Sequence, residues 1–137
     1  MNMNENTLSA VVEARAPRDA GKRFRVGEIA PLVLSGYMLR LVAALKGADY
    51  EALVHELREA RADTENPDAA LNVVLRTLSG CDPTAVHALI TDLLSHVEVA
   101  ADPRHPEGFR PLLPTDIREL KTLGDVLIAL VVLNLGE

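Results

Sequence analysis

The residues best suited to chemistry in this chain are its four histidines, because imidazole is both a common metal ligand and a general base. They are His55, His87, His96 and His105. None stands near another histidine or a cysteine at a metal-ligand spacing such as HxxxH or CxxC. His87 and His96 share a predicted helix, but nine positions separate them and place them near opposite faces. We therefore expect neither a bound metal nor any other cofactor.

A cysteine nucleophile is the second chemistry to consider, with Cys81 as the attacking thiol and His87 as its base. Cys81 lies between the end of one predicted helix and the start of the next, but no glycine pattern for an oxyanion site surrounds it. Glu56 and Glu59 are paired carboxylates, yet they flank Arg58 on a charged helical face. The pattern favours a half-buried thiol and a solvated surface, so we predict that the chain is not an enzyme.

The elements that would position these residues are predicted to be helices. Apolar side chains recur at helical spacing behind four start signals, namely Pro31, Asp49, Asn66-Pro67 and Asp82-Pro83, and a last helical run follows Thr115. The helix from Pro31 is apolar on both faces and is expected to be central. Strand-like alternation is confined to a short run near Phe24 and to the surroundings of Val99. The prediction is an all-α fold of five or six helices, with room for one short strand near Phe24.

The domain organisation predicted from these signals is simple. Residues 1–21 are polar and contain Pro17 and Gly21, which indicates a flexible N-terminal arm. Residues 22–137 then form a single helical domain, a size that one hydrophobic core can support.

Composition and charge argue against several classes of function. The formal net charge is −6, with 14 Lys and Arg against 20 Asp and Glu, so no basic surface for nucleic acid is expected. A single cysteine excludes an internal disulfide and fits a cytosolic setting. The N-terminus lacks the pattern of a signal peptide, and the apolar run at 126–135 is too short to span a bilayer. We expect no membrane partner.

The apolar run at 126–135 is the feature that suggests binding. A surface helix needs only an apolar stripe, whereas this segment is apolar nearly all round. One side can pack on the protein's own core, and we predict that another protein, either a second copy or a client, covers the rest. The candidate partner-binding residues are Val126, Ala129, Val132, Leu133 and Leu135.

The C-terminal third carries a distinctive order of short motifs: an Arg-Pro-Leu turn, an Asp-Ile pair, a Thr-Leu step and an ending in Leu-x-Leu-Gly. The residues are Arg110, Pro111, Leu112, Asp116, Ile117, Thr122, Leu123, Leu133, Leu135 and Gly136. This order resembles the tail assembly chaperones of long-tailed bacteriophages. The stretch from Phe24 into the helix after Pro31 resembles the opening of the same family, so the resemblance covers residues 23–136.

The resemblance implies a chaperone without catalytic activity that acts during virion morphogenesis. Its client would be the tape measure protein, kept soluble and helical in the host bacterial cytoplasm until tail tube subunits displace the chaperone. Tail tube protein would be recruited through a longer, frameshifted form, and the chaperone would be absent from the mature virion. The alternative is a small helical structural or adaptor protein, from a phage or a bacterium, that acts through homo-oligomer packing.

Overall fold

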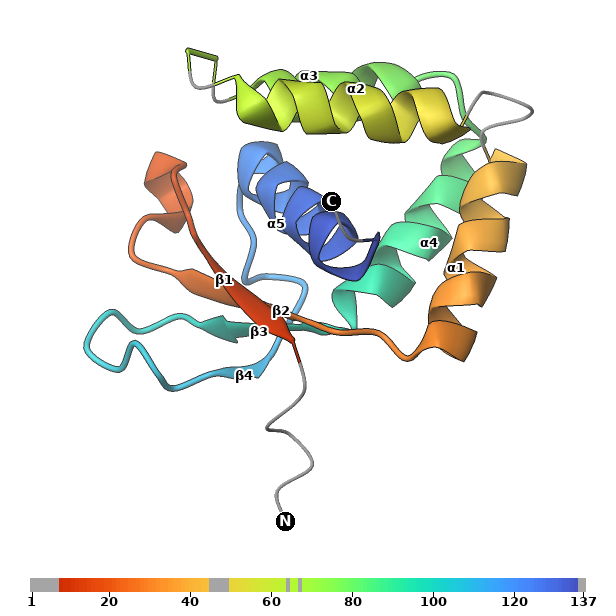
Figure 1. Cartoon of the computed structure of the whole chain (residues 1–137). Coiled ribbons are helices and arrows are strands. Elements are labelled where there is room, and N and C mark those ends of the chain that lie inside the picture. The colour runs from red at the N-terminus through yellow and green to blue at the C-terminus, as the bar shows by residue number, and fades with distance from the viewer. Residues whose placement is uncertain (1–7, 45–49, 64, 67, 136–137) are drawn as a thin grey trace. The chain divides into compact units, whose positions relative to one another are not determined.

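The protein is an α+β protein, and the all-α prediction is wrong (Figure 1). A computed structural model describes residues 8–44, 50–63, 65–66 and 68–135. Within these ranges five α-helices accompany a four-stranded antiparallel sheet. The chain forms two compact units, Met1–Ala30 with Leu93–Glu137, and Pro31–Asp92. The single domain predicted from residue 22 therefore differs from the observed division.

The first unit contains the sheet, in the order β1 (Ser9–Glu13), β2 (Arg23–Gly27), β3 (Val97–Ala100) and β4 (Arg110–Pro111). Alternation along β2 explains its central place. Phe24 and Val26 are fully buried on one face, while Arg23 and Arg25 lie on the other. The register places Val12 of β1 and Val99 of β3 beside Phe24, which extends the apolar face across three strands.

Helix α5 (Leu120–Leu135) contacts β1 and β2 and provides the rest of this core. Thr122, Val126 and Leu130 are four residues apart, so they share one side of the helix, and all three are buried. Asn134 continues this side. Its side-chain oxygen accepts the Ile29 N–H at 2.6 Å, and its amide nitrogen donates to the Gly27 carbonyl at 3.1 Å.

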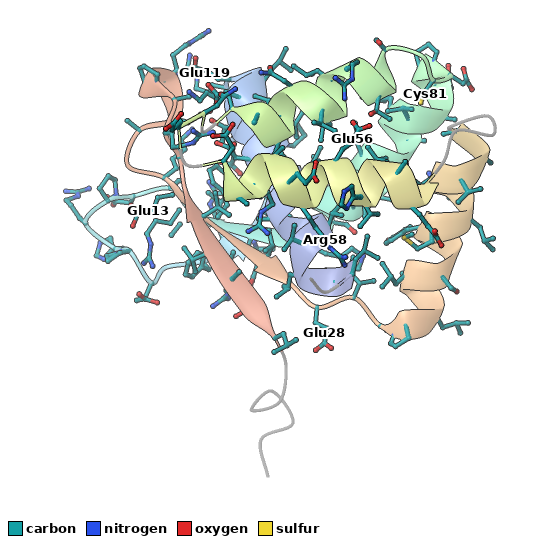
Figure 2. The ribbon with its side chains drawn as sticks, turned by 45° about the horizontal axis from the view of Figure 1, so that its top comes forward. Glu13, Glu28, Glu56, Arg58, Cys81 and Glu119 are labelled. Atoms are coloured by element: carbon teal, nitrogen blue, oxygen red, sulfur yellow. The ribbon has the colours of Figure 1, made fainter. Side chains whose placement is uncertain are left out.

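The second unit consists of helices α1 (Pro31–Ala44), α2 (Tyr50–Ala62) and α3 (Ala69–Leu78), together with α4 (Pro83–Leu94) up to Asp92. Helices α2 and α3 pack side by side (Figure 2). Arg76 of α3 donates a hydrogen bond to Glu56 of α2. Arg40 of α1 forms an ion pair with Asp92 of α4.

Much of the segment predicted as a flexible arm is structured. Residues 9–13 pair with β2 along their whole length, and a 3₁₀ helix, η2, follows at Pro17–Asp19. Residues 1–7 of that arm lie outside the described residues. The correction has a physical cause: β1 is short and becomes stable only by pairing with β2, which local sequence patterns do not reveal.

The helix starts were predicted with mixed success. Those at Pro31 and Pro83 are confirmed. The last helix begins at Leu120 rather than near Asp116, because residues 112–119 form turns and bends. In the described part of the chain, no helix has the length and apolar character required to cross a membrane.

Candidate functional site

Several of the residues on which the resemblance rests lie around the start of α5. Arg110 donates two hydrogen bonds to the Asp116 carboxylate, at 2.8 and 2.7 Å. The Leu113 N–H donates a third, at 2.6 Å. Only 6% of Asp116 is exposed. A bidentate guanidinium–carboxylate pair fixes distance and orientation together, so this pair closes the turn between β4 and α5. Asp116 is thus the anchor of a turn and not the first residue of a helix.

A second carboxylate, which the sequence did not single out, lies beside this turn. Asp19 is fully buried, and its oxygens accept the N–H groups of Arg118 at 3.0 Å and Glu119 at 3.1 Å. These N–H groups immediately precede α5, where negative charge is favourable. Lys22 donates to the Asp19 carboxylate at 3.2 Å and to the Asp116 carbonyl at 2.7 Å. We call Asp19, Lys22, Arg110 and Asp116 the carboxylate clasp.

Both carboxyl groups of the clasp are held in the ionised form. Burial acts to raise the pKa of Asp19, but the Thr122 hydroxyl, the Arg118 and Glu119 N–H groups and Lys22 together lower it below 3.8. The hydrogen bonds from Arg110, opposed by burial and aided by Leu113, lower the pKa of Asp116. A general acid or base at neutral pH needs the opposite shift, so the clasp supports structure rather than proton transfer.

Five further residues of the resemblance adjoin the clasp in sequence. Leu133 and Leu135 instead lie at the other end of α5, and Gly136 lies outside the described residues. Thr122 and Leu123 lie in the first turn of α5, Thr122 buried and Leu123 partly buried. Pro111 is exposed in β4, and Leu112 and Ile117 are partly buried in the connection between β4 and α5. Sequence reasoning missed Asp19 because about a hundred positions separate it from the N–H groups that it accepts. Of the four residues of the clasp, only Arg110 and Asp116 are among those on which the resemblance rests.

The four histidines and the cysteine lie far apart along the described part of the chain, on different elements and turns. No group of three or more His, Cys, Asp or Glu side chains there could hold a metal ion. His55 lies 3.0 Å from Glu59 on the exposed side of α2. The Cys81 thiol, at the turn between α3 and α4, donates to the Thr77 carbonyl at 3.4 Å (Figure 2). That contact satisfies the thiol within its own helix end and does not involve His87.

The predicted partner-binding residues of α5 have different degrees of burial. Val126 is fully buried, so its assignment to a partner surface is corrected: the side chain belongs to the core. Ala129, Val132, Leu133 and Leu135 are each partly exposed. None of these positions is among the strongly exposed large apolar residues of the described chain.

Helix α1 carries the exposed apolar surface instead. Leu32 is 86% exposed and Leu39 is 72% exposed, with Gly36 and Ala43 exposed between and beyond them. Positions 32, 36, 39 and 43 follow helical spacing and form one side of α1, which we call the α1 stripe. Arg40 is the only charged residue of the helix, and it is paired with Asp92. The expectation that this helix is central is wrong for the side that carries the stripe.

The helices of the second unit differ in the type of side chain that they expose. Helix α2 carries charged side chains such as Glu56 and Arg58 (Figure 2). Helix α1 instead exposes leucine, valine and alanine side chains to solvent. An apolar helix side of this kind, exposed along its length, is typical of a surface that another protein covers. A comparison of the chain with family models, curated proteins and solved structures finds no match.

Proposed function

We propose that this protein is a phage tail assembly chaperone that binds apolar helices of the tape measure protein and keeps them soluble. The α1 stripe is the observation that supports binding, because it leaves large apolar side chains in water on an otherwise folded unit. The motif resemblance supplies the identity of the client. From the same resemblance we propose that the chaperone acts in the host bacterial cytoplasm, is absent from the mature virion, and has tail tube protein as a second partner through a longer form.

The stripe has the form that a client helix requires. An amphipathic helix binds through apolar residues spaced three and four apart, and Leu32 and Leu39 offer side chains at a matching spacing. Full burial of each leucine contributes about 1.5–3 kcal/mol relative to leaving it exposed. Gly36 leaves a gap between the two leucines into which a client side chain can insert. Binding of this type is reversible, as a chaperone that is later displaced requires.

The alternative function is that of a structural or adaptor protein whose stripe forms a permanent contact. The two functions differ in what the protein does to a foreign apolar helix. A chaperone raises the soluble yield of an aggregation-prone fragment, whereas an adaptor leaves it unchanged.

The experiment is co-expression of the full chain with tape measure fragments encoded by the same phage. Wild-type protein should move at least one fragment from the pellet to the soluble fraction and co-purify with it. Leu39→Asp should abolish this effect, because the carboxylate would have to be buried against the client. Leu75→Asp is the matched control, since Leu75 is an exposed leucine (52%) on α3. Circular dichroism checks that both variants remain folded.

Two outcomes would count against the chaperone. Fragments that stay insoluble with wild-type protein remove the proposed client. Equal losses from Leu39→Asp and Leu75→Asp show that binding does not use the α1 stripe.

A further inference from the structure

We infer that, in the absence of a client, a second copy of this chain covers the α1 stripe, with the two α1 helices antiparallel about a two-fold axis. The second copy would keep the α1 stripe covered until a client helix displaces it, and this regulatory role rests on the proposed function. The pairing of the two copies itself requires no client.

The order of large and small residues in the stripe is complementary to itself. In an antiparallel pair of identical helices, Leu32 of one copy lies opposite Ala43 of the other, and Gly36 lies opposite Leu39. Both pairs are centred on the same point of the helix, between Tyr37 and Met38, so a single two-fold axis satisfies them. Each large side chain then meets a small one, as an interface between identical surfaces requires.

Gly36 gives independent support. A glycine inside a helix lowers its stability relative to alanine, and such a residue usually marks a close approach. A Cβ atom at position 36 would meet nothing within 4 Å in the chain itself. No packing against the rest of the described chain therefore explains the glycine, whereas close approach of Leu39 from a second copy would.

Charge also favours a second copy at this surface. The protein carries a net charge of −6, so two copies repel one another over most of their surface. Helix α1 contains no Asp or Glu and has one positive residue, Arg40. By contrast, α2 carries Glu51, Glu56 and Glu59. The residues of the α1 stripe therefore bring no carboxylates of their own together, and Asp92, which contacts α1, is neutralised by Arg40.

The size of the stripe limits the strength of the pair. A helix of 14 residues is about 21 Å long, and one such contact is smaller than the roughly 800 Å² that each partner buries in a standard specific interface. We therefore expect a reversible, concentration-dependent dimer that a client helix can displace.

The test is the molar mass of the full chain, measured by sedimentation and light scattering over a range of concentrations. Wild-type protein should shift from 14.8 kDa towards about twice that mass as concentration rises. Gly36→Leu should raise the concentration needed for dimerisation by more than about tenfold, because the introduced side chain would collide with Leu39 of the second copy. The double variant Gly36→Leu with Leu39→Ala should restore much of the association, because the large and small positions are exchanged.

These variants separate the proposed geometry from general stickiness. If the stripe were only a non-specific apolar surface, Gly36→Leu would add apolar area and strengthen association, and that result would overturn the inference. So would a wild-type protein that stays monomeric at every concentration. Helical circular dichroism confirms that Gly36→Leu folds, as the open space at position 36 leads us to expect.

The inference and the proposed function can fail separately. A monomeric wild-type protein that still solubilises a tape measure fragment would remove the dimer and leave the chaperone. A dimer that follows the pattern of the variants without solubilising any fragment would remove the client and leave the dimer.

Discussion

Asp19 shows how a single residue connects distant parts of the chain. Its carboxylate accepts backbone N–H groups from Arg118 and Glu119 and a charged hydrogen bond from Lys22. Asp19→Asn keeps the shape but removes the charge and replaces one acceptor oxygen with a donor. We expect a loss of about 1–3 kcal/mol in the free energy of unfolding, measured by urea titration. Asp102→Asn is the control, because the Asp102 carboxylate bonds locally to Arg104, and its effect should be small. Equal effects would contradict the clasp.

The carboxylate clasp also predicts how stability depends on pH. The pKa values of Asp19 and Asp116 are lowered in the folded state below the ordinary value of 3.8. For a lowered pKa, the stabilisation is fully present above the unfolded-state pKa and is lost as pH falls through the folded-state pKa. The urea midpoint should therefore fall as pH decreases from about 4 through the acid range, and the fall should be smaller in Asp19→Asn than in wild type. An acid dependence unchanged by that substitution would rule out this role for Asp19.

Two glycines illustrate opposite requirements at the residue scale. Gly36→Ala should raise the free energy of unfolding by up to about 1 kcal/mol in dilute solution, because alanine favours the helix and its Cβ meets open space. Gly21→Ala should lower it by about 1–3 kcal/mol. Gly21 has a φ of 87°, and an added Cβ would lie 2.9 Å from the Pro103 Cγ atom. Urea titration of both variants tests the pair, and a destabilising Gly36→Ala would mean that the chain itself needs the glycine.

At the scale of elements, the packing of α5 depends on the side-chain amide of Asn134 as well as on the apolar residues of the helix. Asn134→Leu makes the helix more apolar, yet it leaves the Ile29 N–H and the Gly27 carbonyl without their side-chain partner. We expect a loss of about 1–3 kcal/mol, measured by thermal or urea unfolding. Leu135→Asn places an amide on the neighbouring, partly exposed position and should cost less. If Asn134→Leu were neutral or stabilising, the amide would not anchor α5 to the end of β2.

The elements that the sequence predicted well are those with local signals. Proline at a first helical position identified the starts of α1 and α4, and alternation around Phe24 identified β2. The other strands were missed or only suggested, because a strand of two to five residues is stabilised by its partner and not by its own pattern. The start of α5 was misplaced for a related reason, since the N–H groups just before it bond to Asp19, which is distant in sequence.

The candidate site could be predicted only in part for similar reasons. Periodicity shows that a helix is apolar on two sides, but not which side the fold covers. For α5 the sequence suggested an exposed side, and the structure buries Val126 completely. For α1 the sequence suggested a central helix, and the structure exposes Leu32 and Leu39. The assignment of Val126 and the central place of the stripe side of α1 were wrong at the step from element to tertiary packing, whereas Ala129, Val132, Leu133 and Leu135 stay a prediction.

At the scale of the whole molecule, the net charge of the protein and the uncharged α1 stripe together predict how dimerisation depends on salt concentration. Two copies at −6 repel, and this repulsion opposes dimerisation. Raising the ionic strength from about 0.01 M to about 0.15 M shortens the Debye length from about 30 Å to about 8 Å and screens that repulsion. The stripe contains no ion pair between copies that salt could weaken. Dimerisation should therefore strengthen as salt is added.

The sign of this salt effect distinguishes the α1 stripe from a charged interface. The exposed side of the sheet offers such an alternative, with Arg25 paired to Glu98 beside the Phe109 ring. Copies that met there would exchange charged contacts, and added salt would weaken their association. Sedimentation of wild-type protein at low and physiological salt decides between the two surfaces, with Gly36→Leu as the control whose association should stay low in both.

Lowering the pH towards the isoelectric point near 5.2 should act like salt on the wild-type dimer, because it removes the same net charge.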